Sequence, residues 1–600
     1  MKFSLSIVFV CLSIFCNAQE TGSITGKLTD KEAGNTPLAF ANILVKGTSK
    51  GTISDFDGNY IIENIAPGNY TLIFSFVGYK TVEIGDVKVV ANQTIQVDAS
   101  LAASAAALDQ VIVKAKTSRE LESALLFEQK DAIVMKQAIG AQELARKGIG
   151  NVAEGVVKIS GIAKQESRGI VVRGLGERYN FLTVNGLPMI TGNPDKKIIP
   201  LDKFTTDIVR NINVYKTFNA DLSGDFAGAS FDIVTKDIPT KPVTSIKIGV
   251  SGNSQTTFQS FKTDEESAVE GLGISGNNRD LPTVYGKNLK QLGYASTPEA
   301  SKTLFGTGFN VEEYDAPLAS SLEIIHGNGF DQNKEKNTSF GYYMGFNFEN
   351  NFSTIPGASL KNLNTQGGFN SNYRDVEEYS LTTKKSSLIS LQFDKRDKFR
   401  LKFNNIFIQT TSNFTREQFG YNSEANDDFF ARISRYRETI INQTQLLGDW
   451  NLAENNRHQV EFGTSYGFGF YNEPDRKLLY SEGKGPNSAL FISNSSEPNR
   501  YYADLDIRNL NGFLEYNLGL GAANGFNEDE FSHNLTLGAD ANHLKYDYFN
   551  RVVRLNVDPT AFPSGAATIK DIPLNTNNPD EYIYQGFDQG WLNYEDGSDA

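Results

Sequence analysis

Two glycines one residue apart, Gly174 and Gly176, are the first feature of the sequence that invites a chemical interpretation. A Gly-x-Gly-x-x-Gly loop that opens a helix cradles the phosphates of a dinucleotide. Here the last position of that motif is Tyr179, and a β run follows instead of a helix. The glycines therefore predict a tight turn or a close approach of two backbones, and no cofactor is expected.

Other residues that catalyse reactions or hold metals are thinly spread. The histidines, His326, His458, His533 and His543, are too scattered for recognisable metal-ligand spacing. No nucleophile–histidine–acid set and no pair of carboxylates stands out. The net charge of −14 argues against a nucleic-acid partner, because phosphate binding needs a basic face. We therefore expect neither an enzyme nor a nucleic-acid-binding protein.

Residues 1–18 are typical of an export signal. Lys2 supplies the positive start, residues 3–15 the apolar run, and residues 16–18 the small-residue cleavage pattern. The apolar run is too short to span the ~30 Å of hydrocarbon in a membrane as a helix. Both cysteines, Cys11 and Cys16, would leave with the signal, so no disulfide framework is expected in the mature chain.

Residues 22–101 predict a small β-sandwich. Short β runs, such as residues 24–28 and 70–77, are separated by turn dipeptides such as Asp57-Gly58. The stretch resembles the carboxypeptidase-regulatory-like domain, a seven-stranded Greek-key sandwich. The matching positions are Gly26, Gly47, Thr48, Gly51, Thr52, Asp55, Asp57, Gly58, Tyr60, Gly68, Tyr70, Gly78 and Tyr79. No peptidase activity is expected, because the metal ligands of a peptidase are missing.

Residues 102–116 form a predicted linker that contains a β-prone run, residues 108–113. This run is either one more edge strand or an exposed strand that a partner captures through main-chain hydrogen bonds. Its place between two folded regions favours the second interpretation, and it resembles the coupling box of TonB-dependent receptors. The residues assigned to partner binding are Asp109, Gln110, Val111, Ile112 and Val113.

Residues 117–239 contain the stretch around which the chain is organised, residues 168–189. It combines a β run, the glycine pair, a charged knuckle, a second β run and a turn at Asn185-Gly186. Before it, residues 116–147 predict mostly helix, and residues 151–159 predict a short helix with one apolar face.

This order resembles the plug domain of TonB-dependent receptors, with contact points at residues 150–162, 171–189, 208–216 and 224–236. The residues assigned to the plug gate are Arg173, Gly174, Gly176, Glu177, Arg178, Asn185 and Gly186. The charged ones are either solvated or paired with polar groups on a barrel's inner wall, which would hold the plug by breakable polar contacts. A charged insertion at residues 194–200 departs from the family pattern; it is either a ligand-touching apical loop or a solvated loop.

Residues 240–600 alternate between long β runs and connections of two kinds. Turns at residues 394–397 and 454–457 are short, whereas residues 411–438 and 472–500 predict long polar loops. Apolar and polar residues alternate along residues 460–470. Short turns on one rim, long loops on the other and this alternation are typical of an outer-membrane β-barrel, although a soluble sandwich with one buried face is the alternative. The family implies 22 strands, so we expect only the front part of the barrel here.

The predicted fold class is mainly β: a Greek-key sandwich, a mixed α/β plug, and an antiparallel transmembrane barrel. The resemblance, in its Bacteroidetes-type form, implies an outer-membrane receptor with its N-terminal module in the periplasm. A TonB-type energy-transducing protein, powered by a proton-driven inner-membrane complex, would open the plug; a surface lipoprotein is a further candidate partner. Siderophores, oligosaccharides and peptides all fit as cargo. The alternative is a passive surface-binding or signalling barrel.

Overall fold

The computed structural model describes residues 21–597 except 32–33, 35, 49, 77–78, 103–121, 132–134, 166–168, 221, 265–268, 277–278, 286–294, 334–337, 364–368, 396–397, 454–456, 494–495 and 524–530. The predicted export signal and the predicted partner-binding residues Asp109–Val113 lie outside the described residues. The chain divides into two compact units, residues 1–116 and residues 117–600.

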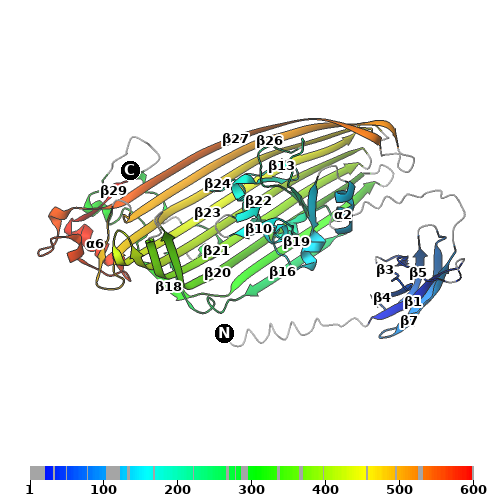
Figure 1. Cartoon of the computed structure of the whole chain (residues 1–600), viewed down its shortest axis with the longest axis horizontal. Coiled ribbons are helices and arrows are strands. Elements are labelled where there is room, and N and C mark those ends of the chain that lie inside the picture. The colour runs from blue at the N-terminus through cyan, green and yellow to red at the C-terminus, as the bar shows by residue number, and fades with distance from the viewer. Residues whose placement is uncertain are drawn as a thin grey trace. The chain divides into compact units, whose positions relative to one another are not determined.

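The first unit is a β-sandwich of two sheets (Figure 1). One sheet holds β4 (Asn59–Ile65), β1 (Gly22–Asp30), β7 (Thr94–Gln96) and β8 (Ala99–Leu101), and the other holds β3 (Gly51–Ile53), β2 (Asn42–Val45), β5 (Gly68–Ser75) and β6 (Val82–Val89). Strands β7 and β8 both pair with β1 in parallel, one beside each half of it. Alternate apolar side chains, such as Ile24, Leu28 and Phe74, fill the space between the sheets. The predicted sandwich is confirmed.

The second unit begins with a small mixed domain, which we call the plug. Its sheet has the order β13 (Leu187–Pro188), β12 (Phe181–Val184), β15 (Ser230–Thr235), β14 (Val209–Tyr215) and β9 (Lys136–Gly140). Around it lie the hairpin β10 (Ile162–Gln165) and β11 (Gly169–Val172), the helices α2 (Glu122–Asp131), α3 (Ala141–Arg146) and α4 (Val152–Val156), and the 3₁₀ turns η1 (Glu177–Tyr179), η2 (Leu201–Lys203) and η3 (Thr206–Ile208). The short helix predicted over residues 151–159 is confirmed as α4.

The prediction of helix across residues 116–147 is wrong in its middle. Residues Lys136–Gly140 form β9, which pairs antiparallel with β14 from Lys136↔Tyr215 to Gly140↔Asn211. Buried Ile139 joins the apolar core of the plug from this strand. Helical propensity is a weak prior, and here the pairing with a central strand of the plug decides the conformation.

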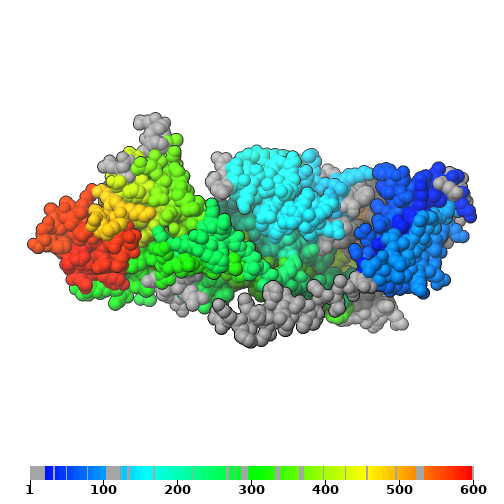
Figure 2. Space-filling model, turned by 90° about the horizontal axis from the view of Figure 1, so that it is seen from below, coloured from blue at the N-terminus to red at the C-terminus, as the bar shows by residue number. Residues whose placement is uncertain are grey.

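The rest of the second unit is one large antiparallel sheet, which we call the wall. Its order is β16 (Val243–Ser251), β19 (Ala319–Asn333), β20 (Thr338–Leu363), β21 (Phe369–Lys395), β22 (Phe399–Asn422), β23 (Asn426–Asn451), β24 (His458–Glu482), β26 (Asn499–Ala523), β27 (Phe531–Val557) and β29 (Leu592–Asp596), with β25 (Ser488–Leu490) and β28 (Pro573–Leu574) beside β24. Among the described residues β16 pairs only with β19, so the sheet is open at this edge. Figure 2 shows the plug, in cyan, lying against the green strands of the wall.

The long polar loop predicted over residues 411–438 is wrong, and the loop predicted over residues 472–500 is wrong in its first part, up to residue 482. Strands β22 and β23 remain paired up to Asn422↔Asn426, and β24 extends to Glu482. Charged side chains in these stretches pair across strands, as Arg432 does with Glu417 through Nε at 2.8 Å. Because paired charges are satisfied within the sheet, a polar composition does not end a strand here.

The two faces of the wall differ in polarity, as the alternation predicts. On β24, Tyr466 and Phe468 are 51% and 39% exposed on the outward face, whereas Gly467 and Ser465 are buried on the face that meets the plug. Outward Leu510 of β26 repeats the pattern. The apolar side of the wall therefore points away from the plug.

Two further segments lie at the end of the wall away from its short turns. The inserted segment, residues 252–318, contains the hairpin β17 (Ser260–Asp264) and β18 (Val311–Asp315), together with η4 (Glu270–Leu272), η6 (Thr283–Tyr285) and α5 (Pro298–Ser301). The second segment contains η8 (Pro559–Ala561), η9 (Ile569–Asp571) and α6 (Pro579–Gln589). Figure 1 shows α6 and β18 at the same end of the strands.

Candidate functional site

The predicted gate begins with a tight turn after β11. Arg173 and Gly174 have φ values of 50° and 84°, and Leu175 N donates to Val172 O at 2.9 Å. A non-glycine residue in the left-handed region is uncommon, and Arg173 is held there while its Nη1 donates to Lys216 O at 3.1 Å. The tight turn predicted from the glycines is confirmed at Gly174, whereas Gly176 is extended.

Glu177 is the buried charge of this stretch, and Arg173 and Arg178 are exposed. One carboxylate oxygen of Glu177 lies 3.3 Å from Lys196 Nζ, and the other has no hydrogen-bond partner among the described residues. Burial raises the pKa of Glu177, and the nearby Lys196 opposes that rise. Arg178 lies over the ring of Tyr179. The contacts of these three charges are therefore within the plug, not with the wall as one alternative held.

A carboxyl whose pKa is raised by folding binds its proton more tightly in the folded state than in the unfolded chain. The stability that Glu177 contributes is therefore complete below its ordinary pKa and is lost as the pH rises through its raised, folded-state pKa. We expect Glu177→Gln to raise the unfolding temperature at pH 8 more than at pH 4, measured by calorimetry of the full chain in detergent. Glu143→Gln, which removes a helix-surface pair with Lys147, should change neither value. A lower unfolding temperature for Glu177→Gln at pH 8 would contradict this.

The charged insertion at residues 194–200 is attached to the plug. Lys196 pairs with Glu177, and Lys197 Nζ lies 3.1 Å from Asp225 Oδ1. Ile198 and Ile199 are buried in the apolar core. The insertion is therefore not a freely solvated loop, and its contact with a ligand stays a prediction.

Asn185 and Gly186 join the plug to the wall. Both have positive φ, 53° and 79°, as a two-residue hairpin of the mirror-image type requires. The Asn185 side chain accepts a hydrogen bond from Thr235 N at 3.0 Å and donates to Gln445 Oε1 at 2.8 Å. Gln445 in turn donates to Val184 O at 2.8 Å, so the turn is fixed to β23 from both sides.

Other polar contacts follow the same seam between plug and wall. Gln443 of β23 donates to Pro188 O at 2.9 Å, and Lys402 of β22 donates to Lys236 O at 3.2 Å. Tyr343 of β20 donates its hydroxyl to Asp207 O at 2.7 Å. Each of these wall side chains donates to a backbone carbonyl of the plug, and Lys402 also donates to the hydroxyl of Thr235 at 3.1 Å. These contacts therefore fix the position of the plug backbone.

An apolar patch also holds the plug, whereas one of the two alternatives for the charged residues had polar contacts in place of an apolar core. One continuous core includes plug residues such as Ile190 and wall residues such as Ile441 and Ile507. A Cβ placed on Gly469 would lie 3.0 Å from Ile190 Cδ1, so the small residues of β24 make room for this side chain. The seam between plug and wall is therefore partly apolar, and moving the plug away from the wall exposes apolar surface to water.

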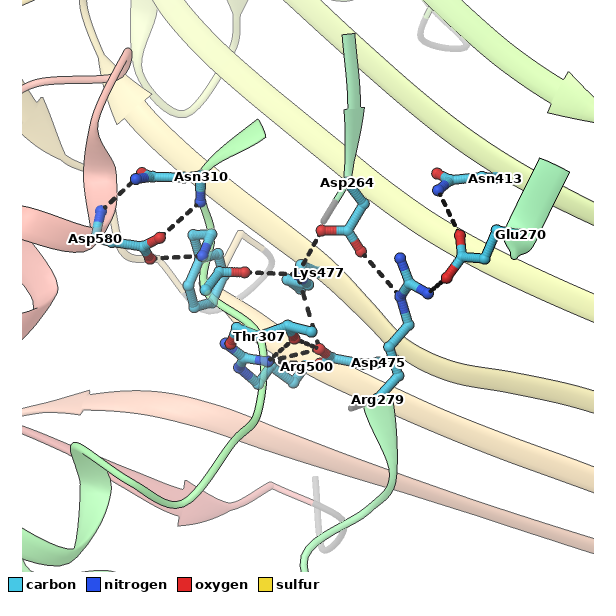
Figure 3. A network of polar contacts seen from close by, with 12 residues as sticks. Asp264, Glu270, Arg279, Thr307, Asn310, Asn413, Asp475, Lys477, Arg500 and Asp580 are labelled. Carbon is cyan, nitrogen blue, oxygen red and sulfur yellow. Dashed lines mark hydrogen bonds and ion pairs between the residues drawn. The ribbon is translucent and has the colours of Figure 1, made fainter. Parts of the chain in front are cut away.

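The inserted segment is fastened to the wall by a buried ionic network (Figure 3). Lys477 of β24 donates to Asp264 Oδ1 at 2.5 Å and to Gly308 O at 2.5 Å. Arg500 of β26 donates to both oxygens of Asp475, at 2.8 and 2.7 Å, and to Thr307 O at 2.5 Å. Buried charges are stable only when they are paired and hydrogen-bonded, as these are.

The network continues along the inserted segment in both directions (Figure 3). Arg279 lies between Asp264 and Glu270, and Glu270 accepts a hydrogen bond from Asn413 of β22 at 3.2 Å. On the other side, Asp580 of α6 accepts from Asn310 N at 3.0 Å. The inserted segment is thus held between the wall and the segment that contains α6.

Sequence reasoning did not find this network. Its carboxylates and cations come from a long stretch between two strands and from strands more than a hundred residues away, as in the pair of Asp264 with Lys477. In the structure, β24 has a β-bulge between Glu473 and Arg476, where Asp475 takes a φ of 55°. Bulges re-aim side chains, and this one accompanies the inward placement of Asp475.

Among the described residues, no group of three or more histidine, cysteine, aspartate or glutamate side chains has the geometry to hold a metal ion. Separately, no helix in the described part of the chain combines the length and the apolar character needed to cross a membrane.

Comparison with known proteins identifies two domains. The CarboxypepD_reg-like domain matches residues 24–113, and the TonB-dependent Receptor Plug Domain matches residues 128–230. TonB-dependent receptor P39 of Formosa agariphila is 25% identical over 366 residues, which cover 56% of this chain and 33% of that protein. TonB-dependent receptor SusC of Bacteroides thetaiotaomicron is 40% identical over 78 residues, 13% of this chain and 7% of that protein.

A solved structure is also similar. The ferripyoverdine receptor of the outer membrane of Pseudomonas aeruginosa covers 70% of this chain and 54% of its own, with 13% identity and a TM-score of 0.37. The chain spans about a third of the first curated relative that it matches. The sandwich and plug resemblances are confirmed by the two domain matches: the chain contains a CarboxypepD_reg-like domain followed by a TonB-dependent receptor plug domain.

Proposed function

We propose that the protein is an outer-membrane receptor that imports a scarce, large nutrient by energy-coupled opening of its plug. The observation that carries the proposal is a separately folded plug seated on the inner face of a sheet of very long strands. Strands β20 to β24 have 24 to 27 residues each, whereas about 9–11 residues suffice to cross a bilayer as a tilted strand. The outward apolar face of these strands would contact lipid.

The mechanism follows from a difference in free energy: displacing the plug requires less than separating the strands of the wall. The wall is held by continuous ladders of backbone hydrogen bonds, such as the register from Lys395↔Phe399 to Ser371↔Asn422. The plug is held by a few side-chain contacts and one apolar patch, so local displacement of the plug costs less than opening the sheet. Cargo would bind above the plug, and the wall would remain intact while the passage opens.

The partner would be a TonB-type protein that pairs with Asp109–Val113 from the periplasm. The cargo class is a siderophore, an oligosaccharide or a peptide. The second candidate function is a passive surface-binding or signalling barrel that transports nothing.

Deletion of residues 108–113 tests the proposal. We expect energy-dependent cargo uptake to be lost while cargo binding at the cell surface is retained. The reason is that the TonB-type partner needs this segment only to open the plug. Deletion of residues 102–107, an adjacent stretch of equal length, serves as the control and should leave uptake near normal. Uptake that survives the first deletion, or that continues after the proton gradient is dissipated, would contradict energy-coupled import. Surface binding without any uptake by the unmodified protein would favour the passive receptor.

A further inference from the structure

A partly open cavity lies between the plug and the wall, beside the inserted segment. Its volume is about 380 Å³, within the range of about 300–1,000 Å³ that is usual for small-molecule sites. The plug contributes α4 and η2 to its lining, and the wall contributes β20, β21 and β22. The inserted segment lies next to it, because Lys385 and Gln409 of the wall donate to Gly273 O at 3.2 and 3.0 Å.

Two hydroxyl groups in the lining of this cavity have no partner. Ser386 Oγ and Thr205 Oγ1 are buried and make no hydrogen bond with any described residue. Ser386 is only 4% exposed. A buried hydroxyl without a hydrogen-bond partner is energetically unfavourable, so two beside one cavity point to hydrogen-bonding groups that enter it.

The charges of the lining favour an anion. The lining holds four lysines, Lys164, Lys203, Lys384 and Lys385, and three carboxylates, Glu154, Asp202 and Glu349. The side-chain ammonium of Lys203 makes no ion pair and no hydrogen bond among the described residues, and burial lowers its pKa although Asp202 and Glu349 oppose that change. The ammonium of Lys385 donates a hydrogen bond to Gly273 O, and this neutral carbonyl does not neutralise the positive charge of the lysine. The carboxylate of Asp202 is already paired with Lys384 at 3.6 Å, so it does not neutralise the Lys203 ammonium completely.

We infer that this cavity is a binding site for a small, hydroxylated anion such as a uronic acid. The carboxylate of the ligand would lie against Lys203, and its hydroxyls would pair with Ser386 and Thr205. The inference rests on the proposed function, since a ligand reaches this seam only in a protein that admits solutes to the space above its plug.

Calorimetric titration of the full chain in detergent tests the site, with glucuronate as the probe and glucose as its neutral counterpart. We expect saturable binding of glucuronate and at least tenfold weaker binding of glucose. Lys203→Gln should weaken glucuronate binding at least tenfold, and Ser386→Ala should weaken it several-fold. Lys203→Arg should retain most of the affinity because it keeps the charge. Lys147→Gln, which removes an exposed plug lysine, should bind as the unmodified chain does.

Three results would overturn the site: no glucuronate binding, equal binding of glucose, or undiminished binding by Lys203→Gln. Unchanged unfolding temperatures of the variants ensure that a loss of binding is not a loss of folding. The titration needs no energy source, so it is independent of the uptake experiment. Failed binding with intact energy-dependent uptake would overturn only the cavity site, whereas intact binding without energy-dependent uptake would overturn only the transport function.

Discussion

Replacing Arg500 by methionine should release the inserted segment from the wall. Arg500 is 1% exposed, donates to Thr307 O, and lies over the rings of Phe305 and Phe309 with its guanidinium carbon 4.3 and 4.9 Å from their centroids. Its loss would leave the carboxylate of Asp475 buried with a weaker partner, Lys477 at 3.8 Å. Breaking one side of a buried ion pair costs about 3–5 kcal/mol, which is enough to open a local segment.

Hydrogen exchange measures this effect directly. Amides of residues 305–310 should exchange at least a hundredfold faster in Arg500→Met, while those of the plug strand β14 keep their protection. Arg554→Met on the neighbouring strand is the matched control, because Arg554 forms a partly exposed pair with Glu497 at 3.0 Å. Exposed pairs contribute only about 0–1 kcal/mol, so this variant should behave as the unmodified chain. Equal protection of residues 305–310 in both variants would show that the network does not hold the segment.

Replacing Ile190 by aspartate should loosen the plug on the wall. Ile190 is buried against Gly467 and Gly469 of β24, and a carboxylate there would have no partner at hand. Burying an unpaired charge costs on the order of several kcal/mol, more than the loss of a single seam hydrogen bond. The plug should therefore leave its seat for part of the time.

Leakage of a large hydrophilic antibiotic into cells is the measurement for this variant. Cells that carry Ile190→Asp should become sensitive, and cells that carry Ile190→Val should not, since the apolar contact is nearly conserved. Phe218→Asp is the matched control, because Phe218 belongs to the same domain but is 66% exposed. If Ile190→Asp cells were no more permeable than Phe218→Asp cells, the apolar patch would not be what seats the plug.

The site could be predicted only in part, and Asn185 shows where the limit lies. The Asn-Gly dipeptide predicts a hairpin turn, because few residues tolerate two consecutive positive φ values. Its partner, Gln445, lies 260 residues further along the chain, and no local pattern connects the two. Likewise the charged knuckle was located correctly, but whether Glu177 met solvent, wall or plug depended on the position of Lys196 after folding.

What the sequence determined by itself is the local and periodic part of this protein. Turn dipeptides, the alternation along β24 and the glycine pair follow from backbone sterics and from a side-chain period of two, which act within a few residues. The tertiary structure alone decided that residues 136–140 form a strand, that polar stretches extend the wall strands, and that Asp264 meets Lys477 and Arg500 meets Asp475. Those outcomes depend on which groups, far apart in the sequence, form hydrogen bonds and ion pairs with one another once water is excluded. Such pairing is a property of the packed chain and of no single segment.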